Sequence, residues 1–306
     1  MRVGESTGSL KTVLVATLLA MTTSPSALAS ASSVEMKQAA ERALAGRAGA
    51  IVVLDVRSGE TLANVFSGMA DLPYPPGSTS KVVTAHAGLQ TGAIHSETTW
   101  TCRNAMRIGG KTFHCTVPGG HGPLKLDEAI SLSCNIWFYQ AARKTGKAAI
   151  YRSWKQLGAQ PVIDPNWNGP VERLGVGQEG IRVSVMDMAK AARTLALKKD
   201  SPSSPCRDIS RGMRLVATAG TAKSLGAAGF DVAGKTGSPA HVLDPEKRHG
   251  WFMGYFPASR PEIAFAVFCL EGSSFESAVP VTQSLLTQYR RKAGGQSPHR
   301  RNPRIY

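Results

Sequence analysis

The stretch Pro76-Gly-Ser-Thr-Ser-Lys81 constrains this chain most, because it combines a tight turn with a hydroxyl and an amine at helical spacing. If it opens a helix, Ser78 and Lys81 lie three residues apart on one face. Ser78 is then in the first turn, where free backbone N–H groups and the positive end of the helix dipole are found. Taken alone, the stretch more often marks an N-capped surface helix. The rival serine, Ser80, points about 100° away from Lys81 on a helix.

Two motifs further along the chain strengthen the chemical interpretation. Ser133-Cys134-Asn135 has the form S-x-N, and Lys235-Thr236-Gly237-Ser238 contains K-T-G at the end of an apolar run. The three motifs follow one another about 55 and about 100 residues apart, an order that chance rarely produces. We therefore expect them to converge on one acyl-transfer site.

Each residue type in these motifs suits one role. Ser78 attacks a carbonyl carbon and becomes acylated, while Lys81, desolvated beside other cations, is neutral enough to act as its base. Ser133 passes a proton to the leaving amine, and the Asn135 amide holds the substrate backbone. The other roles are binding roles: Lys235 and Thr236 hold a terminal carboxylate, Gly237 admits the substrate close to the strand, and the N–H groups of Ser78 and Ser238 form an oxyanion hole.

The pattern of elements predicts an α+β fold. A capping box from Ser32 to Glu35 opens a helix that ends near Gly46. A helical middle contains an irregular segment at residues 95–123, and a helix over 277–291 closes the chain. Apolar strands are expected at 50–56, 61–66, 230–235, 250–256 and 263–270. The simplest architecture is an antiparallel sheet of about five strands, flanked by the terminal helices and a helical subdomain.

With these motifs, the chain resembles the penicillin-binding protein transpeptidase family over roughly residues 48–290. The similarity is to class B members of the elongation type, and it rests on Ala50–Glu60, Pro76–Lys81, Gly120–Gly122, Ser133–Asn135, Gly175–Gln178, Val183–Ala189, Ala233–Ser238 and Trp251–Pro257. The resemblance implies the serine β-lactamase/DD-peptidase fold. It also implies a D,D-transpeptidase that acts on D-Ala-D-Ala stem peptides of peptidoglycan and is acylated by β-lactams. This chemistry requires no cofactor.

Related activities remain as alternatives. A D,D-carboxypeptidase differs only in its acyl acceptor, and a β-lactam sensor is acylated without turnover. A β-lactamase of class A needs a glutamate-activated water, and Glu172 and Glu179 lie in about the right part of the chain. Class B relatives also carry a large N-terminal domain. Here only about 20 residues separate the expected cleavage site from the first strand, so we expect a stand-alone catalytic domain.

Four soft metal ligands are spread over about 33 residues around Gly120-His121-Gly122, and the last of them lies within the S-x-N motif. Cys102, Cys115, His121 and Cys134 form a complete tetrahedral set for a structural zinc ion. Some elongation-type relatives are similar in this region and hold zinc there. The alternative is a Cys102–Cys115 disulfide, with His121 in a loop and Cys134 as a buried thiol. Spacing alone does not decide between them, nor does it show whether the two other cysteines, Cys206 and Cys269, pair.

The N-terminus predicts export. Arg2 and Lys11 precede a short apolar run, and Ala27-Leu28-Ala29 is typical of a cleavage site. We expect a signal peptide over residues 1–29, a transpeptidase domain over 30–292 and a disordered basic tail over 293–306. An exported chain of this kind is periplasmic or extracytoplasmic. The alternative is an uncleaved segment that anchors it to the membrane.

The charge balance indicates the class of partner. The formal net charge is +15, and six Lys and Arg residues fall within residues 290–304. Such a surface attracts polyanions. Export argues against nucleic acid, which leaves anionic lipid or the acidic polymers of a cell envelope. The alternative is a solvated basic face that aids solubility and binds no partner. Protein partners and the oligomeric state are not indicated by the sequence.

Overall fold

The computed structural model describes Met1 and residues 25–295. At its centre lies a five-stranded antiparallel sheet with the order β2-β1-β11-β10-β9. The strands are β1 (Gly49–Asp55), β2 (Thr61–Ser67), β9 (Ala233–Gly237), β10 (Gly250–Phe256) and β11 (Ile263–Cys269). The early strand β1 pairs with the late strand β11, from Gly49 opposite Cys269 to Asp55 opposite Ile263. The predicted α+β fold with about five strands is confirmed.

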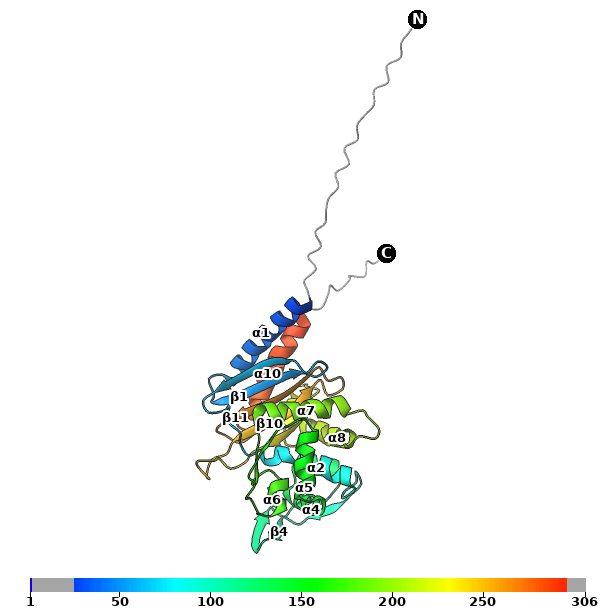
Figure 1. Cartoon of the computed structure of the whole chain (residues 1–306), viewed down its shortest axis with the longest axis vertical. Helices are drawn as coiled ribbons and strands as arrows, with labels where there is room; N and C mark the ends of the chain where they lie inside the picture. The colour runs from blue at the N-terminus through cyan, green and yellow to red at the C-terminus, as the bar shows by residue number, and fades with distance from the viewer. Residues whose placement is uncertain (2–24, 296–306) are drawn as a thin grey trace.

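Helices cover both faces of this sheet (Figure 1). The terminal helices α1 (Pro25–Leu44) and α10 (Ala278–Gly295) pack together on one face. On the other face lie α7 (Val185–Lys198) and α8 (Pro205–Thr218), with the short α9 (Lys223–Ala227) after α8. Because both faces are covered, every residue of the apolar strands β10 and β11 is buried. The edge strand β9 borders the helical region.

The helical region forms around α2 (Ser80–Thr91), which contacts α8 and the other helices of this region. A single 3₁₀ turn, η1 (Gly77–Thr79), leads directly into α2. The other helices are α3 (Leu126–Ser131), α4 (Asn135–Thr145), α5 (Lys147–Gln156) and α6 (Val171–Gly175). Two short strands, β7 (Val162–Ile163) and β8 (Ile181–Arg182), pair beside them. This region is the expected helical subdomain.

The segment at 95–123 differs from the expected irregular excursion. It contains β3 (Trp100–Cys102), which pairs with β6 (Gly122–Leu124), and β4 (Ala105–Ile108), which pairs with β5 (Lys111–His114). The turn between β4 and β5 consists of Gly109 and Gly110, both with positive φ. Such a pair of central residues favours a tight hairpin. The strands are too short to give a clear alternating pattern, which is why the sequence predicted no strands here.

Two helix boundaries also differ from expectation. Helix α1 begins at Pro25 rather than at the capping box, since proline is tolerated at the first helical position and the following alanines favour helix. Residues 25–29 of the expected signal peptide are therefore helical, and its residues 2–24 lie outside the described part. Helix α10 runs to Gly295, three residues past the expected domain end, and residues 296–306 of the expected tail are not described. Among the described residues, no helix is long and apolar enough to cross a membrane.

Candidate active site

The turn that carries Ser78 is held from several sides. The Gly77 N–H donates to the carbonyl oxygen of Gly177 over 2.8 Å, and the Thr79 hydroxyl donates to the Pro76 carbonyl over 2.7 Å. Gly77 has a φ of +55°, and a Cβ atom there would lie 2.7 Å from Cδ of Pro239. The turn therefore needs glycine at this position. It presents Ser78, half-buried, to a cleft.

The rival serine does not face this cleft. Ser80 is fully buried, and its hydroxyl has no hydrogen-bond partner among the described residues. Ser78 lies in η1, and Lys81 lies in the first turn of α2. The structure therefore favours Ser78 as the nucleophile.

Ser133 lies in the short turn between α3 and α4. Its φ of +56° is in the left-handed region, which is uncommon for residues other than glycine. The turn is fixed because the Ser133 N–H donates to Ile130 and the Cys134 N–H donates to Ala129. Strained backbone of this kind persists where surrounding contacts hold it, often at functional sites.

Lys81 is fully buried against this turn. Its Nζ donates to the carbonyl oxygen of Ser133 at 2.5 Å, to Oδ1 of Asn135 at 2.7 Å and to Oγ of Ser133 at 3.2 Å. Burial disfavours the charged amine and lowers the pKa of Lys81 to about 8. About a tenth of this amine is therefore neutral at pH 7, far more than for an ordinary lysine, and the neutral form can act as a general base.

Lys235, on the edge strand β9, approaches Ser133 from the other side. Its Nζ donates to Oγ of Ser133 at 2.9 Å and to the carbonyl oxygen of Thr236 at 3.1 Å. Burial first, and the nearby Lys81 second, hold the pKa of Lys235 well below its usual range. The Ser133 hydroxyl thus accepts from both lysines. Its own proton is left free to be donated elsewhere.

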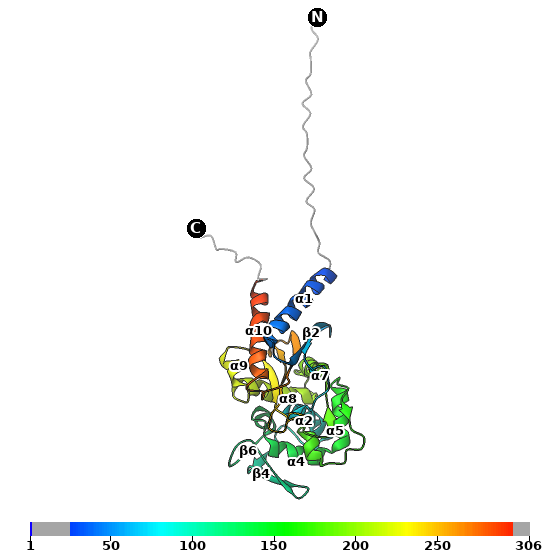
Figure 2. The same ribbon diagram turned by 90° about the vertical axis from the view of Figure 1, so that its left-hand side faces the viewer.

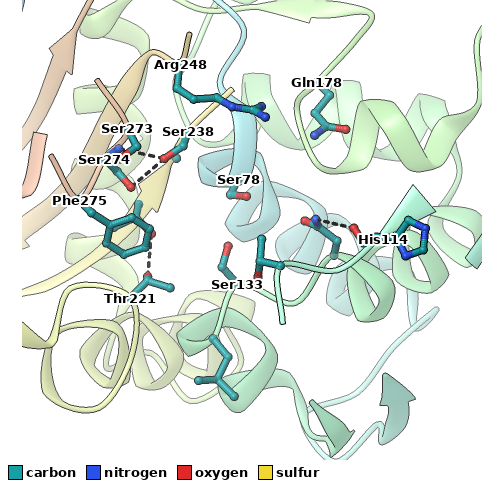
Figure 3. Close-up of a pocket in the computed structure, with 15 residues that line it drawn as sticks. Ser78, His114, Ser133, Gln178, Thr221, Ser238, Arg248, Ser273, Ser274 and Phe275 are labelled. Carbon is teal, nitrogen blue, oxygen red and sulfur yellow. Dashed lines mark hydrogen bonds between the residues drawn. The ribbon is translucent and has the colours of Figure 1, made fainter. Parts of the chain in front are cut away.

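These residues border one cleft of about 460 Å³ (Figure 3). A Cβ on Gly237 would lie 2.8 Å from the Pro76 carbonyl oxygen, so this close packing of β9 against the Ser78 turn requires glycine. The Ser238 hydroxyl donates to that of Ser274 at 2.9 Å. Of the eight catalytic and substrate-binding residues predicted from the sequence, six line the cleft: Ser78, Ser133, Asn135, Thr236, Gly237 and Ser238. Lys81 and Lys235 lie behind it and contact Ser133.

Several lining residues were not predicted as site residues. Thr221 bonds the Thr236 hydroxyl at 2.7 Å, and it follows Gly220, where a Cβ would lie 2.4 Å from the Ser131 carbonyl oxygen. A Gly-Thr pair after a helix was the available signal. Loops and short strands bring the rest, and their placement depends on tertiary packing: His114, Thr116, Leu132, Gln178, Arg248, Ser273, Ser274 and Phe275.

The four predicted metal ligands come together beside the same turn. The sulfur atoms of Cys102, Cys115 and Cys134 and a ring nitrogen of His121 all lie within 4.8 Å of one another. Sγ of Cys115 is 3.5 Å from Nδ1 of His121 and 3.8 Å from Sγ of Cys134. All three cysteines are buried.

The cysteines are all free thiols in the structure, which corrects the disulfide alternative. Cys102 and Cys115 are not bonded to each other, nor are Cys206 and Cys269. A disulfide requires a sulfur–sulfur distance of about 2.05 Å.

The two glutamates that were candidates for activating a deacylating water lie outside the cleft. Glu172 is buried and forms an ion pair with Arg143 at 2.6 Å. Glu179 forms one with Arg173 at 2.8 Å. Both carboxylates therefore have structural partners of their own, and neither is a lining residue of the cleft.

Comparison with known proteins places these features in context. Residues 49–286 match the profile of the penicillin binding protein transpeptidase domain. Over 252 residues the chain is 28% identical to the peptidoglycan D,D-transpeptidase PbpA of Mycolicibacterium smegmatis, covering 67% of this chain and 51% of the relative. It is 25% identical to the peptidoglycan D,D-transpeptidase MrdA of Acinetobacter baumannii, over 80% of this chain and 51% of the relative. The chain spans about half the length of these curated relatives.

Solved structures show the same fold. PBP2 of Pseudomonas aeruginosa superposes with a TM-score of 0.75 at 23% identity, over 84% of this chain and 74% of that protein. The transpeptidase domain of penicillin-binding protein 3 from Burkholderia pseudomallei also superposes with a TM-score of 0.75, at 21% identity, over 89% of this chain and 96% of that domain.

Proposed function

Because the chain belongs to the penicillin-binding protein transpeptidase family, we propose that it is an active-site-serine D,D-transpeptidase acting on D-Ala-D-Ala stem peptides of peptidoglycan. One observation carries the proposal. Two buried lysines, Lys81 and Lys235, donate to the Ser133 hydroxyl at the cleft that contains Ser78. This arrangement supplies a nucleophile, a base of lowered pKa and a proton donor for the leaving amine.

The acylation step follows from these positions. Neutral Lys81 takes the Ser78 proton, and Oγ of Ser78 attacks the carbonyl carbon of the penultimate D-Ala. The C–N bond to the terminal D-Ala then breaks, and the Ser133 hydroxyl gives its proton to the leaving nitrogen. Ser133 regains a proton from Lys81, so charge and protons balance. An acceptor amine attacks the acyl-enzyme in the second half of the reaction, which regenerates Ser78.

The substrate is held by the remaining residues. Lys235 and Thr236 bind the terminal carboxylate, with Thr221 fixing the Thr236 hydroxyl. Asn135 binds the substrate backbone through its amide. The backbone N–H groups of Ser78 and Ser238 stabilise the developing oxyanion, a contribution of roughly 3–4 kcal/mol per donor in other acyl-transfer enzymes.

Labelling with a fluorescent penicillin tests this proposal. The wild-type protein is expected to form a covalent adduct that survives denaturing electrophoresis. Ser78→Ala should abolish the adduct. Ser80→Ala is the matched control and should retain it, because that hydroxyl is buried away from the cleft. Labelling of Ser78→Ala at the wild-type rate would rule out the mechanism.

The lifetime of the adduct separates the alternatives. A transpeptidase or a β-lactam sensor holds the penicilloyl group for long periods, whereas a β-lactamase releases it rapidly. The ion pairs of Glu172 and Glu179 argue against a glutamate-activated water of the class A type. Product analysis of a D-Ala-D-Ala donor with and without an acceptor amine then distinguishes transpeptidation from D,D-carboxypeptidation or from absent turnover.

The proposal extends to a structural zinc ion. Three buried thiols and one imidazole that converge within 4.8 Å fit the donor set that Zn²⁺ prefers, so Cys102, Cys115, His121 and Cys134 would hold it. The ion would clamp the turn that carries Ser133 and take no part in acyl transfer. Metal analysis of gently purified protein, with thiol counting before and after chelation, should give one zinc per chain. Protein purified without zinc that has three reactive thiols at this site, those of Cys102, Cys115 and Cys134, would contradict it.

We propose further that the protein is exported and works at the cell envelope. The predicted signal over residues 1–29, the domain over 30–292 and the basic tail over 293–306 support this location, as does the formal net charge of +15. N-terminal sequencing of the protein from the envelope fraction of its host should begin at Ser30. A sequence that begins at residue 1 or 2 would instead support the membrane anchor.

A further inference from the structure

The two ends of the cleft differ in how their cations are held. At one end, Lys235 is fully buried and bonded to Ser133 and Thr236. Toward the other end, the connection between β9 and β10 contributes Arg248, which is exposed. Among the described residues that line the cleft, Arg248 is the sole lysine or arginine, and none is aspartate or glutamate. The lining is therefore suited to an anionic molecule.

Within the described residues, no protein group neutralises the charge of Arg248. Within residues 25–295 it forms neither an ion pair nor a side-chain hydrogen bond, whereas its neighbour Lys247 pairs with Glu271 at 3.0 Å. Figure 3 shows the Arg248 side chain above Ser78, on the opposite side of that serine from Thr221. A planar guanidinium with five donors binds a carboxylate through two parallel hydrogen bonds. Arg248 thus presents a free carboxylate-binding group to the cleft.

The strand register places Arg248 at a defined distance from the terminal-carboxylate site. Arg248 lies opposite Ala240 in a bridge that continues the β9–β10 hairpin past the Gly237–Trp251 pair. Four residues separate Thr236 from Ala240, which corresponds to about 13 Å along an extended strand. A donor peptide that runs along β9 covers about 7 Å in two residues, and a long side chain covers the rest. The side chain two residues before the terminal D-Ala therefore reaches Arg248.

We propose that Arg248 is a specificity residue that binds a second carboxylate of the acyl donor, carried upstream of the D-Ala-D-Ala terminus. The inference rests on the proposed transpeptidase function and adds to it the chemical class of stem peptide. Donors with a carboxylate at the end of the third side chain, and β-lactams with a carboxylate on the acyl side chain, are the favoured ligands. Donors that lack this group leave the guanidinium in water.

A matched pair of β-lactams tests this directly. Benzylpenicillin and its α-carboxy derivative, carbenicillin, differ by one carboxylate on the acyl side chain and share the ring carboxylate. The measurement is the second-order rate constant of acylation for each compound, and the quantity compared is their ratio. In Arg248→Ala the ratio of carbenicillin to benzylpenicillin should fall about fivefold to tenfold relative to wild type. Arg248→Lys, which keeps the charge but loses the planar fork, should give an intermediate ratio.

The control is Lys247→Ala, which removes an adjacent exposed cation that pairs with Glu271 outside the cleft, and its ratio should equal that of the wild type. An unchanged ratio in Arg248→Ala, with normal benzylpenicillin acylation, would overturn this inference and leave the proposed function intact. An equal fall for both compounds would overturn it too, since Arg248 would then bind the shared ring carboxylate. A wild-type protein that reacts with neither compound would contradict the proposed function and the inference with it.

Discussion

Two clusters meet at the turn Ser133-Cys134-Asn135, and they are built in different ways. On one side, the amines of Lys81 and Lys235 donate hydrogen bonds of 2.5–3.2 Å to oxygen atoms of the turn. On the other side, Cys134 belongs to the cysteine–histidine cluster with Cys102, Cys115 and His121, whose contacts are 3.5–3.8 Å long. The lysine cluster is stabilised by its own hydrogen bonds. The cysteine–histidine cluster has the geometry of a ligand set.

The two clusters therefore have different roles: the lysine cluster takes part in the reaction, and the cysteine–histidine cluster positions the turn. The side chains of Ser133 and Asn135 contact Lys81, whereas the thiol of Cys134 contacts that of Cys115. A change in the lysine cluster should therefore alter the reaction itself. A change in the cysteine–histidine cluster should alter how firmly the turn is held, and through that the reaction.

The largest expected effect is that of Lys81→Ala. This variant removes the base and leaves the Ser133 carbonyl and Asn135 amide without their donor, so acylation by benzylpenicillin should fall about a thousandfold. Stopped-flow or quench-flow measurement of the acylation rate constant gives the value. Lys155→Ala, on the exposed surface of α5, is the matched control. A loss below tenfold would show that another group acts as the base.

The second prediction is the pH dependence of acylation. The folded-state pKa of Lys81 lies near 8, below its usual value of 10.5, and the amine acts as a base only when neutral. The rate should rise about tenfold per pH unit below 8 and level off above it, so that pH 6 gives about one hundredth of the plateau rate. A flat profile between pH 6 and 8 in buffers of equal ionic strength would contradict this assignment.

Disruption of the cysteine–histidine cluster should have a smaller effect on the reaction and a clear effect on stability. Cys134→Ala is expected to lower acylation about tenfold to a hundredfold, the range found when outer positioning groups of functional sites are lost. With the proposed zinc ion bound in the wild type, chelator should lower the melting temperature of the wild type. Cys134→Ala should have a lower melting temperature that chelator no longer changes. Cys206→Ala removes a buried thiol in α8, away from the turn, and serves as control. If Cys134→Ala and Cys206→Ala respond equally to chelator, the cysteine–histidine cluster does not position the turn through a metal ion.

The smallest expected effect is on stability, and it comes from the strained backbone at Ser133. Ser133→Gly and Ser133→Ala both lose the hydroxyl, so both should acylate very slowly. Glycine accepts the φ of +56° without the steric cost that alanine carries. Ser133→Gly should therefore be about 1 kcal/mol more stable to urea than Ser133→Ala. Identical unfolding free energies would show that the turn relaxes in the variants.

The sequence predicted the parts of the molecule whose signal is local. Continuous apolar runs indicated β10 and β11, and three motifs named Ser78, Ser133 and Lys235. Arg248 carries no local signal, because strand register brings it to the cleft. Thr221 carries only the Gly-Thr pair that follows α8, and loop packing places it beside Thr236. The proximity of Cys102 to Cys134 likewise depends on the folding of short paired strands, which the sequence pattern did not reveal.

The pairing of the terminal helices determines how the molecule is oriented when it is attached to a surface through its N-terminal end. Arg42 on α1 donates to Gln288 on α10, and the two helices lie together at the end of the molecule opposite to β4 (Figures 1 and 2). Helix α1 has 20 residues and a length of about 30 Å. A group attached before Pro25 therefore stands off from the sheet by up to that length. Immobilisation through this end leaves the helical region pointing outward, so a tethered molecule keeps its cleft accessible to a polymeric substrate in front of it.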